Sequence, residues 1–133
     1  MIERRGCMSA LYHEGYIYVI GGLNYTDKCL KKCERYHLTI KKDELMADDE
    51  AAFDNKESLE KWKKIADLKE PRKNASAIAM TADTIYVFGG TSNSYQTLSS
   101  IESYSIASNR WQLLKVSMPR PLCFLTTFKI SPT

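Results

Sequence analysis

"GYIYVIGGLNY" occupies residues 15–25 and "DTIYVFGGTSN" occupies residues 83–93. Each stretch joins a short apolar run to a Gly-Gly pair, and the pairs begin 68 residues apart, at Gly21 and Gly89. Other identities recur at the same spacing: Tyr18 with Tyr86, Val19 with Val87, Glu34 with Glu102, Tyr36 with Tyr104, and Arg4 with Arg72. Several matches at one fixed spacing indicate an internal repeat, and a repeat determines the fold.

The first copy of the repeat is longer than the second. Trp62 and Trp111 lie only 49 residues apart, and the interval from Tyr36 to Trp62 exceeds that from Tyr104 to Trp111 by 19 residues. The period is therefore about 49 residues, and the first copy carries an insertion at about 39–61.

These spacings divide the chain into units. We expect a first repeat over residues 1–68, a second over 69–116, and the start of a third over 117–133. A Pro-Arg pair follows each tryptophan, and we expect Pro119-Arg120 to open the third unit as Pro71-Arg72 opens the second.

The pattern of each unit predicts four short strands. In the second copy we expect strands over 75–81, 84–89, 101–106 and 111–115, because turn-rich pieces separate them. Residues 33–38 read as a strand of the first copy. The run "IYVF" is apolar on both faces, which favours a strand between two neighbouring sheets.

Two features of the repeat have a predicted structural purpose. The Gly-Gly pairs should end equivalent inner strands where backbones crowd and a positive φ is needed, so they are not ligand-cradling loops. Tyr104 and Trp111 are large amphipathic residues, and we expect them to fill the space between adjacent sheets with their polar tips paired.

The joint pattern resembles the kelch repeat. An apolar-Tyr-Val-apolar-Gly-Gly run is followed by Glu-x-Tyr, Trp and Pro-Arg, although Tyr36-His37 and Tyr104-Ser105 depart from the Tyr-Asp often found in the family. The residues that carry the motif are Gly21, Gly22, Gly89, Gly90, Glu34, Tyr36, Glu102, Tyr104, Trp62 and Trp111. The resemblance implies an all-β fold, a kelch-type β-propeller fragment of four-stranded antiparallel blades around a central channel.

The resemblance also bears on assembly. Because the sequence contains two units and part of a third, further blades or self-assembly must close the propeller. We interpret the sequence as a piece of a longer protein, with assembly from several copies as the alternative.

Composition places the chain among cytoplasmic globular proteins. Apolar residues make up 44% and charged residues 26%, and no apolar run approaches the roughly 18 residues of a membrane helix. The four cysteines should stay as free thiols in a reducing compartment. Cys29, Cys33 and His37 have a spacing that suggests zinc only weakly, so we expect no metal and no cofactor.

The charges are unevenly distributed. Residues 43–60 contain eight acidic residues and one lysine, whereas the whole chain has a net charge of +3, so the rest of the chain is strongly basic. Residues 43–61 lack Pro and Gly and would suit a short helix capped by Asp43. A solvated loop and a docking motif for a basic partner are the alternatives.

The resemblance implies a non-catalytic protein-binding module, such as a ubiquitin-ligase adaptor or a cytoskeletal scaffold. The loops after the Gly-Gly pairs, 23–30 and 91–99, carry suitable contact groups. The predicted contact residues are Asn24, Tyr25, Asn93, Tyr95 and Gln96, together with Arg72 and Arg120 for an acidic partner. Turn chemistry is the alternative for Asn24 and Asn93, and a structural role within the blade is the alternative for the arginines.

Other function classes find less support. Some propellers of this kind are copper oxidases with paired histidines and a tyrosine, but His13 and His37 occupy non-equivalent places, and no catalytic residue is proposed. Binding of nucleic acid is not expected, because the basic residues are scattered without aromatic groups interleaved in one stripe.

Overall fold

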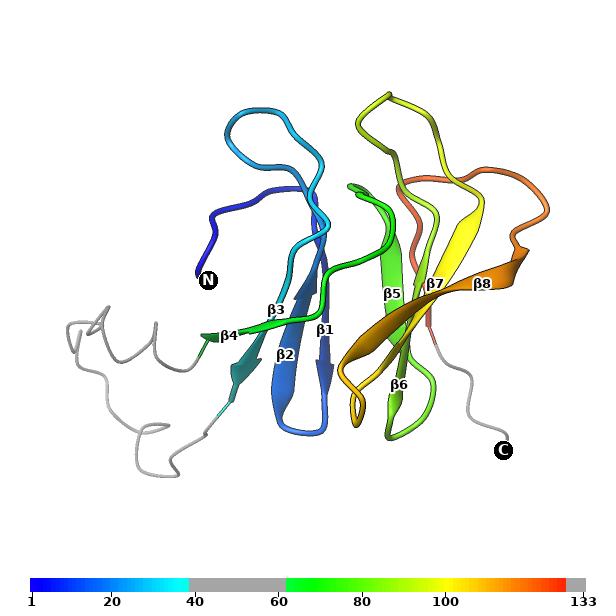
Figure 1. Ribbon diagram of the computed structural model, residues 1–133. Helices are drawn as coiled ribbons and strands as arrows, with labels where there is room; N and C mark the ends of the chain where they lie inside the picture. Colours follow the sequence, from blue (N-terminus) through cyan, green and yellow to red (C-terminus); the bar gives the residue numbers. More distant parts are fainter. Residues whose placement is uncertain (39–61, 129–133) are drawn as a thin grey trace.

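The computed structural model describes residues 1–38 and 62–128, and these residues form two four-stranded antiparallel sheets side by side (Figure 1). The first sheet, blade 1, has the strand order β1-β2-β3-β4, and the second, blade 2, has the order β5-β6-β7-β8. The strands are β1 Ser9–His13, β2 Tyr16–Ile20, β3 Cys33–His37, β4 Trp62–Ile65, β5 Ser76–Ala79, β6 Thr84–Phe88, β7 Ser100–Ser105 and β8 Arg110–Ser117. The predicted all-β, four-stranded antiparallel blades are confirmed.

The strands lie close to the positions that were predicted from the turn residues. Each of the four strands expected in the second copy is present, and the largest differences are of two residues: β5 ends at Ala79 and β8 continues to Ser117. A bulge between Ser100 and Glu102 shifts the register between β7 and β8. The insertion at about 39–61, with its proposed helix, lies outside the described residues. The described residues contain no helix long and apolar enough to cross a membrane.

The hydrophobic core lies between the two blades. Tyr18, Val19 and Ile20 on β2 are each at most 3% exposed, so the end of this strand is buried on both faces. On β6, which contains the IYVF run, Ile85 and Val87 are buried but Tyr86 and Phe88 are only half-buried. Residues of both blades form one buried cluster: Tyr18, Ile20, Cys33, Ile65, Leu68, Ile85, Val87, Tyr104 and Trp111. Burial of each large apolar side chain contributes about 1.5–3 kcal/mol, so contact between the blades is a main source of stability.

Tyr104 and Trp111 fill the space between the blades, but only one of their polar tips is paired. The Tyr104 ring lies 6.4 Å from that of Tyr18 and 5.0 Å from that of Trp111. The Tyr104 hydroxyl donates to Asn109 Oδ1, which also accepts a hydrogen bond from the Ala66 amide of blade 1. The buried Trp111 Nε1 has no hydrogen-bond partner in the described part of the chain, so the pairing expected for this group is wrong.

The Gly-Gly pairs lie where strand ends meet the segment that enters the next blade. All four glycines have positive φ, from 57° at Gly89 to 104° at Gly22. A Cβ on Gly21 would lie 2.4 Å from the Arg72 carbonyl oxygen, which is far inside contact distance. The Gly22 amide donates to that same carbonyl. These positions need both a left-handed backbone and the absence of a side chain.

Each blade also contains a buried arginine–carboxylate clamp. In blade 2, Glu102 is fully buried, and its carboxylate accepts hydrogen bonds from the amides of Lys69 and Glu70. Arg72 Nη2 donates to Glu102 at 2.8 Å, and Nη1 donates to the Gly89 carbonyl. The clamp therefore joins the chain entering blade 2 to β7 and to the Gly-Gly pair.

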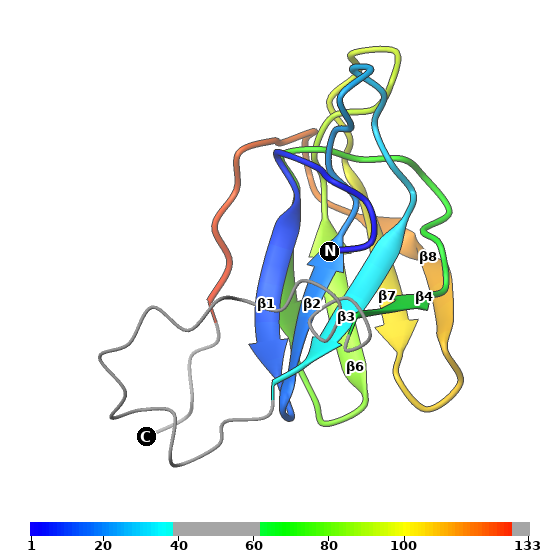
Figure 2. The ribbon, with the colours of Figure 1, turned by 90° about the vertical axis from the view of Figure 1, so that its left-hand side faces the viewer.

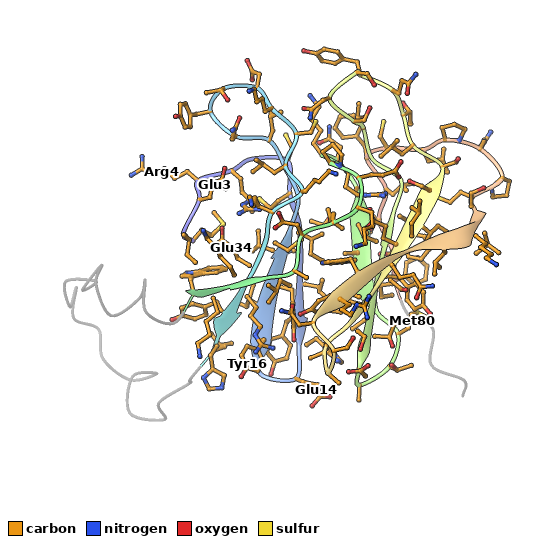
Figure 3. The ribbon with its side chains drawn as sticks, in the orientation of Figure 1. Glu3, Arg4, Glu14, Tyr16, Glu34 and Met80 are labelled. Atoms are coloured by element: carbon orange, nitrogen blue, oxygen red, sulfur yellow. The ribbon has the colours of Figure 1, made fainter. Side chains whose placement is uncertain are left out.

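Blade 1 repeats this clamp with Arg5 and not with Arg4. Glu34 accepts hydrogen bonds from the amides of Ile2 and Glu3 and from Arg5 Nη2, and Arg5 Nη1 donates to the Gly21 carbonyl. Arg4 is exposed and points away from the blade (Figure 3). The match of Arg4 with Arg72 is wrong by one residue.

The error comes from the first hairpin of each blade. Ser9 pairs with Ile20, whereas Ser76 pairs with Phe88, so the second hairpin holds one more residue. Identities before the hairpin therefore recur at 67 residues and identities after it at 68.

The two Pro-Arg pairs are also not structurally equivalent. The Gly90 amide donates to the Leu122 carbonyl, as the Gly22 amide does to that of Arg72. Leu122 thus takes the place of Arg72, and the exposed Arg120 lies two residues earlier. The longer β8 and its bulge account for this shift.

Substitution of Gly21 by alanine should destabilise the chain more than substitution of Gly15. Gly15 also has a positive φ, 78°, but an added Cβ would meet nothing within 4 Å, so Gly15→Ala should cost only about 1–2 kcal/mol. Gly21→Ala adds a backbone clash to this cost. Urea denaturation measures both variants, and equal losses would contradict the crowding described here.

Removal of the Glu102 charge should destabilise blade 2 strongly. Glu102→Gln leaves the buried Arg72 guanidinium without its counter-charge, at a cost of about 3–5 kcal/mol. The control is Glu14→Gln at the exposed β1–β2 turn, which should change stability by less than about 0.5 kcal/mol. Trp111 fluorescence during urea unfolding reports both, and an unaltered midpoint for Glu102→Gln would refute the clamp.

Candidate functional site

The loops after the two Gly-Gly pairs stand at the same end of the molecule (Figures 1 and 2). We call residues 23–29 and 91–97 the rim loops. Isolated bridges fix the base of each loop: Gly6 with Leu23 and Leu23 with Cys29 in the first, and Lys73 with Thr91 and Thr91 with Thr97 in the second. The same backbone scaffold therefore presents two loops of different sequence.

The first rim loop is shaped by Asn24. Its Oδ1 accepts hydrogen bonds from the amides of Thr26 and Lys28 and from the Thr26 hydroxyl. Asp27 adopts a positive φ of 57° at the tip of the loop. The Asn24 side chain is thus engaged within its own loop, which favours the turn interpretation over contact with a partner.

Asn93 of the second loop joins the two rim loops together. Its Oδ1 accepts a hydrogen bond from the Cys29 amide at 2.6 Å, and its Nδ2 donates to the Cys29 carbonyl at 3.4 Å. The Cys29 thiol donates to the Thr91 carbonyl. Because one side-chain amide satisfies both backbone groups of Cys29, the rim loops are held as one surface.

Two tyrosines project from this joined surface. Tyr25 is 92% exposed and Tyr95 is 77% exposed. The Lys73 ammonium lies 5.3 Å from the centre of the Tyr95 ring, within cation–π distance. Gln96 is also exposed. Of the contact residues predicted in the rim loops, Tyr25, Asn93, Tyr95 and Gln96 are thus exposed, although the Asn93 amide is engaged by Cys29.

The predicted arginines have different surroundings. Arg72 is 1% exposed, and its guanidinium is engaged by Glu102, Glu70 and Gly89, which favours the structural alternative over contact with an acidic partner. Arg120 is exposed on the segment after β8. The sequence reasoning missed Arg5 and Lys73. A spacing of 67 residues before the hairpin was the signal for Arg5, whereas the counterpart of Lys73 in the first blade is Gly6, so the repeat gives no signal for Lys73.

Two hollows elsewhere in the described chain lack the side chains that catalysis or metal binding usually requires. A groove of about 260 Å³ runs between β1, β5 and residues 125–127, and its lining consists of alanine, serine and threonine side chains together with Met8 and Leu125. Its hydroxyls bond within the fold: Ser9 donates to the Ala75 carbonyl, and Ser76 pairs with Thr127. A recess of about 620 Å³ beside β8 is lined by Lys69, Ser103, Ser105, Ser108, Arg110, Trp111, Gln112 and Leu113. Neither lining contains a histidine, cysteine or carboxylate.

The histidines lie closer to one another than their sequence positions suggest. His13 and His37 both pair with Tyr16 across neighbouring strands, so the three side chains share one face of blade 1. His13 Nε2 donates to the Ala82 carbonyl of blade 2. The Arg35 guanidinium stands 4.6 Å from the Tyr16 ring centre, and this positive charge opposes binding of a metal cation there.

The cysteines behave as separate free thiols. Cys29 donates to Thr91 of blade 2, whereas Cys33 donates to the Lys31 carbonyl of its own segment. Burial raises the pKa of the Cys33 thiol to about 12. No group of three possible metal ligands occurs within residues 1–38 and 62–128.

Thiol reactivity should follow these environments. With iodoacetamide at pH 8, Cys7, which is exposed, should be alkylated first and Cys33 last, at the rate of unfolding. Mass spectrometry of tryptic peptides measures the order of alkylation, and labelling of Cys33 together with Cys7 would contradict it.

Stability should also depend on pH. Because the folded chain raises the Cys33 pKa above its ordinary value of 9.0, the free energy of unfolding should fall as pH rises from about 9 towards 12.

Comparison with known proteins agrees with the architecture. The family model for the kelch motif matches residues 4–42 and 71–115, which are the two Gly-Gly units. Beta-scruin of Limulus polyphemus is 31% identical over 113 residues. This match covers 85% of the chain but only 11% of beta-scruin, so the chain spans about a tenth of that relative.

Proposed function

The chain belongs to the kelch-repeat family, and we propose that it is a non-catalytic module that binds another protein through its rim loops. The observation that carries this proposal is the pair of exposed tyrosines, Tyr25 and Tyr95, on loops that Asn93 joins. Tyrosine is enriched at protein interfaces, where its ring gives a large contact area with few rotatable bonds.

The rigidity of the rim loops supports this proposal. Binding costs free energy when loops must be ordered, and hydrogen bonds that already fix the loops reduce that cost. In the first loop Asn24 supplies these bonds, and between the loops Asn93 does so. The two asparagines hold the surface, and the tyrosines contact the partner.

We further propose that this module serves as a substrate-recognition part of a ubiquitin-ligase adaptor or as a cytoskeletal scaffold, in the cytoplasm, where its four thiols stay reduced. Residues 117–133 would begin a third repeat, because Leu122 and Phe124 repeat backbone hydrogen bonds made by Arg72 and Asn74. Further blades would then complete the propeller.

Loss of both exposed tyrosines should abolish capture of the partner. Tyr25→Ala combined with Tyr95→Ala removes two central contacts, and we expect roughly thirtyfold weaker binding, as for an interface hot spot. The control is Tyr12→Ala, since Tyr12 is 64% exposed but lies on β1, away from the rim loops.

Quantitative affinity capture from cell extract compares the three proteins. The partner should remain bound to the wild type and to the Tyr12→Ala variant and be lost only from the rim variant. Equal retention by all three proteins would place the binding surface elsewhere.

A further inference from the structure

Most carboxylates near the rim loops form ion pairs with neighbouring cations, whereas several cations there form none. Asp67 pairs with Lys32 at 3.0 Å, and Glu70 pairs with Arg72. Within the described chain, four cations on or near these loops form no ion pair: Lys28 in the first rim loop, Lys31 just after it, Lys73 paired with Thr91, and Arg120 two residues before Leu122, whose carbonyl accepts from Gly90. Asp27 is the carboxylate within the rim loops themselves. This end of the molecule therefore carries an excess of positive charge.

Lys73 brings part of this charge between the two rim loops. Its backbone pairs with Thr91, and its ammonium stands over the Tyr95 ring. On the side of the first loop, burial raises the pKa of the Cys29 thiol, and the charge of Lys73 opposes that rise. Lys73 thus acts on both loops from one position. Its counterpart in the first blade is Gly6, so this charge is specific to the junction between the loops.

Tyr95 occupies a backbone conformation that a bulky residue seldom adopts. Its φ is 57°, the same value as at Asp27, which is the equivalent position in the first loop. A side chain with a large ring is disfavoured in this backbone conformation. The Tyr95 side chain is 77% exposed and contributes little to the core. Burial of this ring therefore does not compensate for the strained backbone at Tyr95.

We propose that the rim patch, which consists of Tyr25, Lys28, Lys73, Tyr95 and Gln96, binds an acidic segment of a partner protein. Lys28 and Lys73 would pair with carboxylates, and the two tyrosine rings would pack on the apolar parts of the segment. This inference rests on the proposed function and specifies the chemical class of the partner.

An acidic protein segment fits this patch better than a nucleic acid does. Nucleic-acid backbones carry a charge at every phosphate and are bound by rows of cations. In the rim patch the cations are two, and Asp27 lies directly beside Lys28. A peptide with a few spaced carboxylates and apolar groups matches two lysines on neighbouring segments that also carry exposed tyrosines.

The test is a selection of random 12-residue peptides, displayed on phage, on the immobilised 133-residue chain. The enriched peptides should have a net charge of about −2 to −4. Binding of one synthesised winner should weaken about tenfold for Lys28→Glu and further for Lys28→Glu with Lys73→Glu. The control is Lys63→Glu, an exposed charge reversal on the edge strand β4 opposite Arg35, which should leave affinity unchanged.

Different results of this experiment would overturn the acidic class of the partner alone or the proposed binding function as well. Enriched peptides that lose binding with Tyr25→Ala and Tyr95→Ala but carry no negative charge would overturn the acidic class alone. An absence of enrichment, or enrichment that is insensitive to every rim substitution, would overturn both proposals. Salt-sensitive binding of single-stranded DNA that competes with the winner and exceeds its affinity would assign the patch to nucleic acid.

Discussion

The buried arginine–carboxylate clamp is the constraint on which the rest of the structure depends. Arg72 and Glu102 are both withdrawn from water, a state that is tolerated only because each charge is paired and further hydrogen-bonded. The Glu102 carboxylate also accepts two backbone amides from the chain that enters blade 2. One ion pair therefore fixes where a blade begins, where β7 lies, and how the Gly-Gly pair approaches that junction.

The clamp has consequences at the rim. Since Arg72 donates to the Gly89 carbonyl, it positions the end of β6, from which the second rim loop starts. Arg5 does the same for Gly21 and the first rim loop. The two loops therefore rise from equivalent, rigid supports, and Asn93 can reach Cys29 across the gap between blades. A buried interaction that has no contact with a partner sets the geometry of the surface that we propose for binding.

Much of the fold could be predicted from the sequence because the repeat supplies each position twice. The recurring Val19 and Val87 are both buried. Only one member of each recurring tyrosine pair lies in the core, Tyr18 and not Tyr86, and Tyr104 and not Tyr36. The prediction was wrong where a local change in length shifted the spacing, as for Arg4 and Arg5 before the hairpin and Arg120 and Leu122 after β8. Single-residue insertions leave no mark in composition, and only the strand register reveals them.

The rim was harder to predict, since its residues are by nature those that do not recur. Asn24 and Asn93 have the same residue type but different functions, because Asn24 forms hydrogen bonds within its own loop and Asn93 forms them with the neighbouring loop.

The most direct test of the joined rim is hydrogen exchange of the Cys29 amide, compared between the wild type and Asn93→Ala. We predict a marked loss of protection at Cys29 in the variant, with the Lys69 and Glu70 amides of the clamp unchanged. Equal protection of Cys29 in both proteins would contradict a rim held together by Asn93.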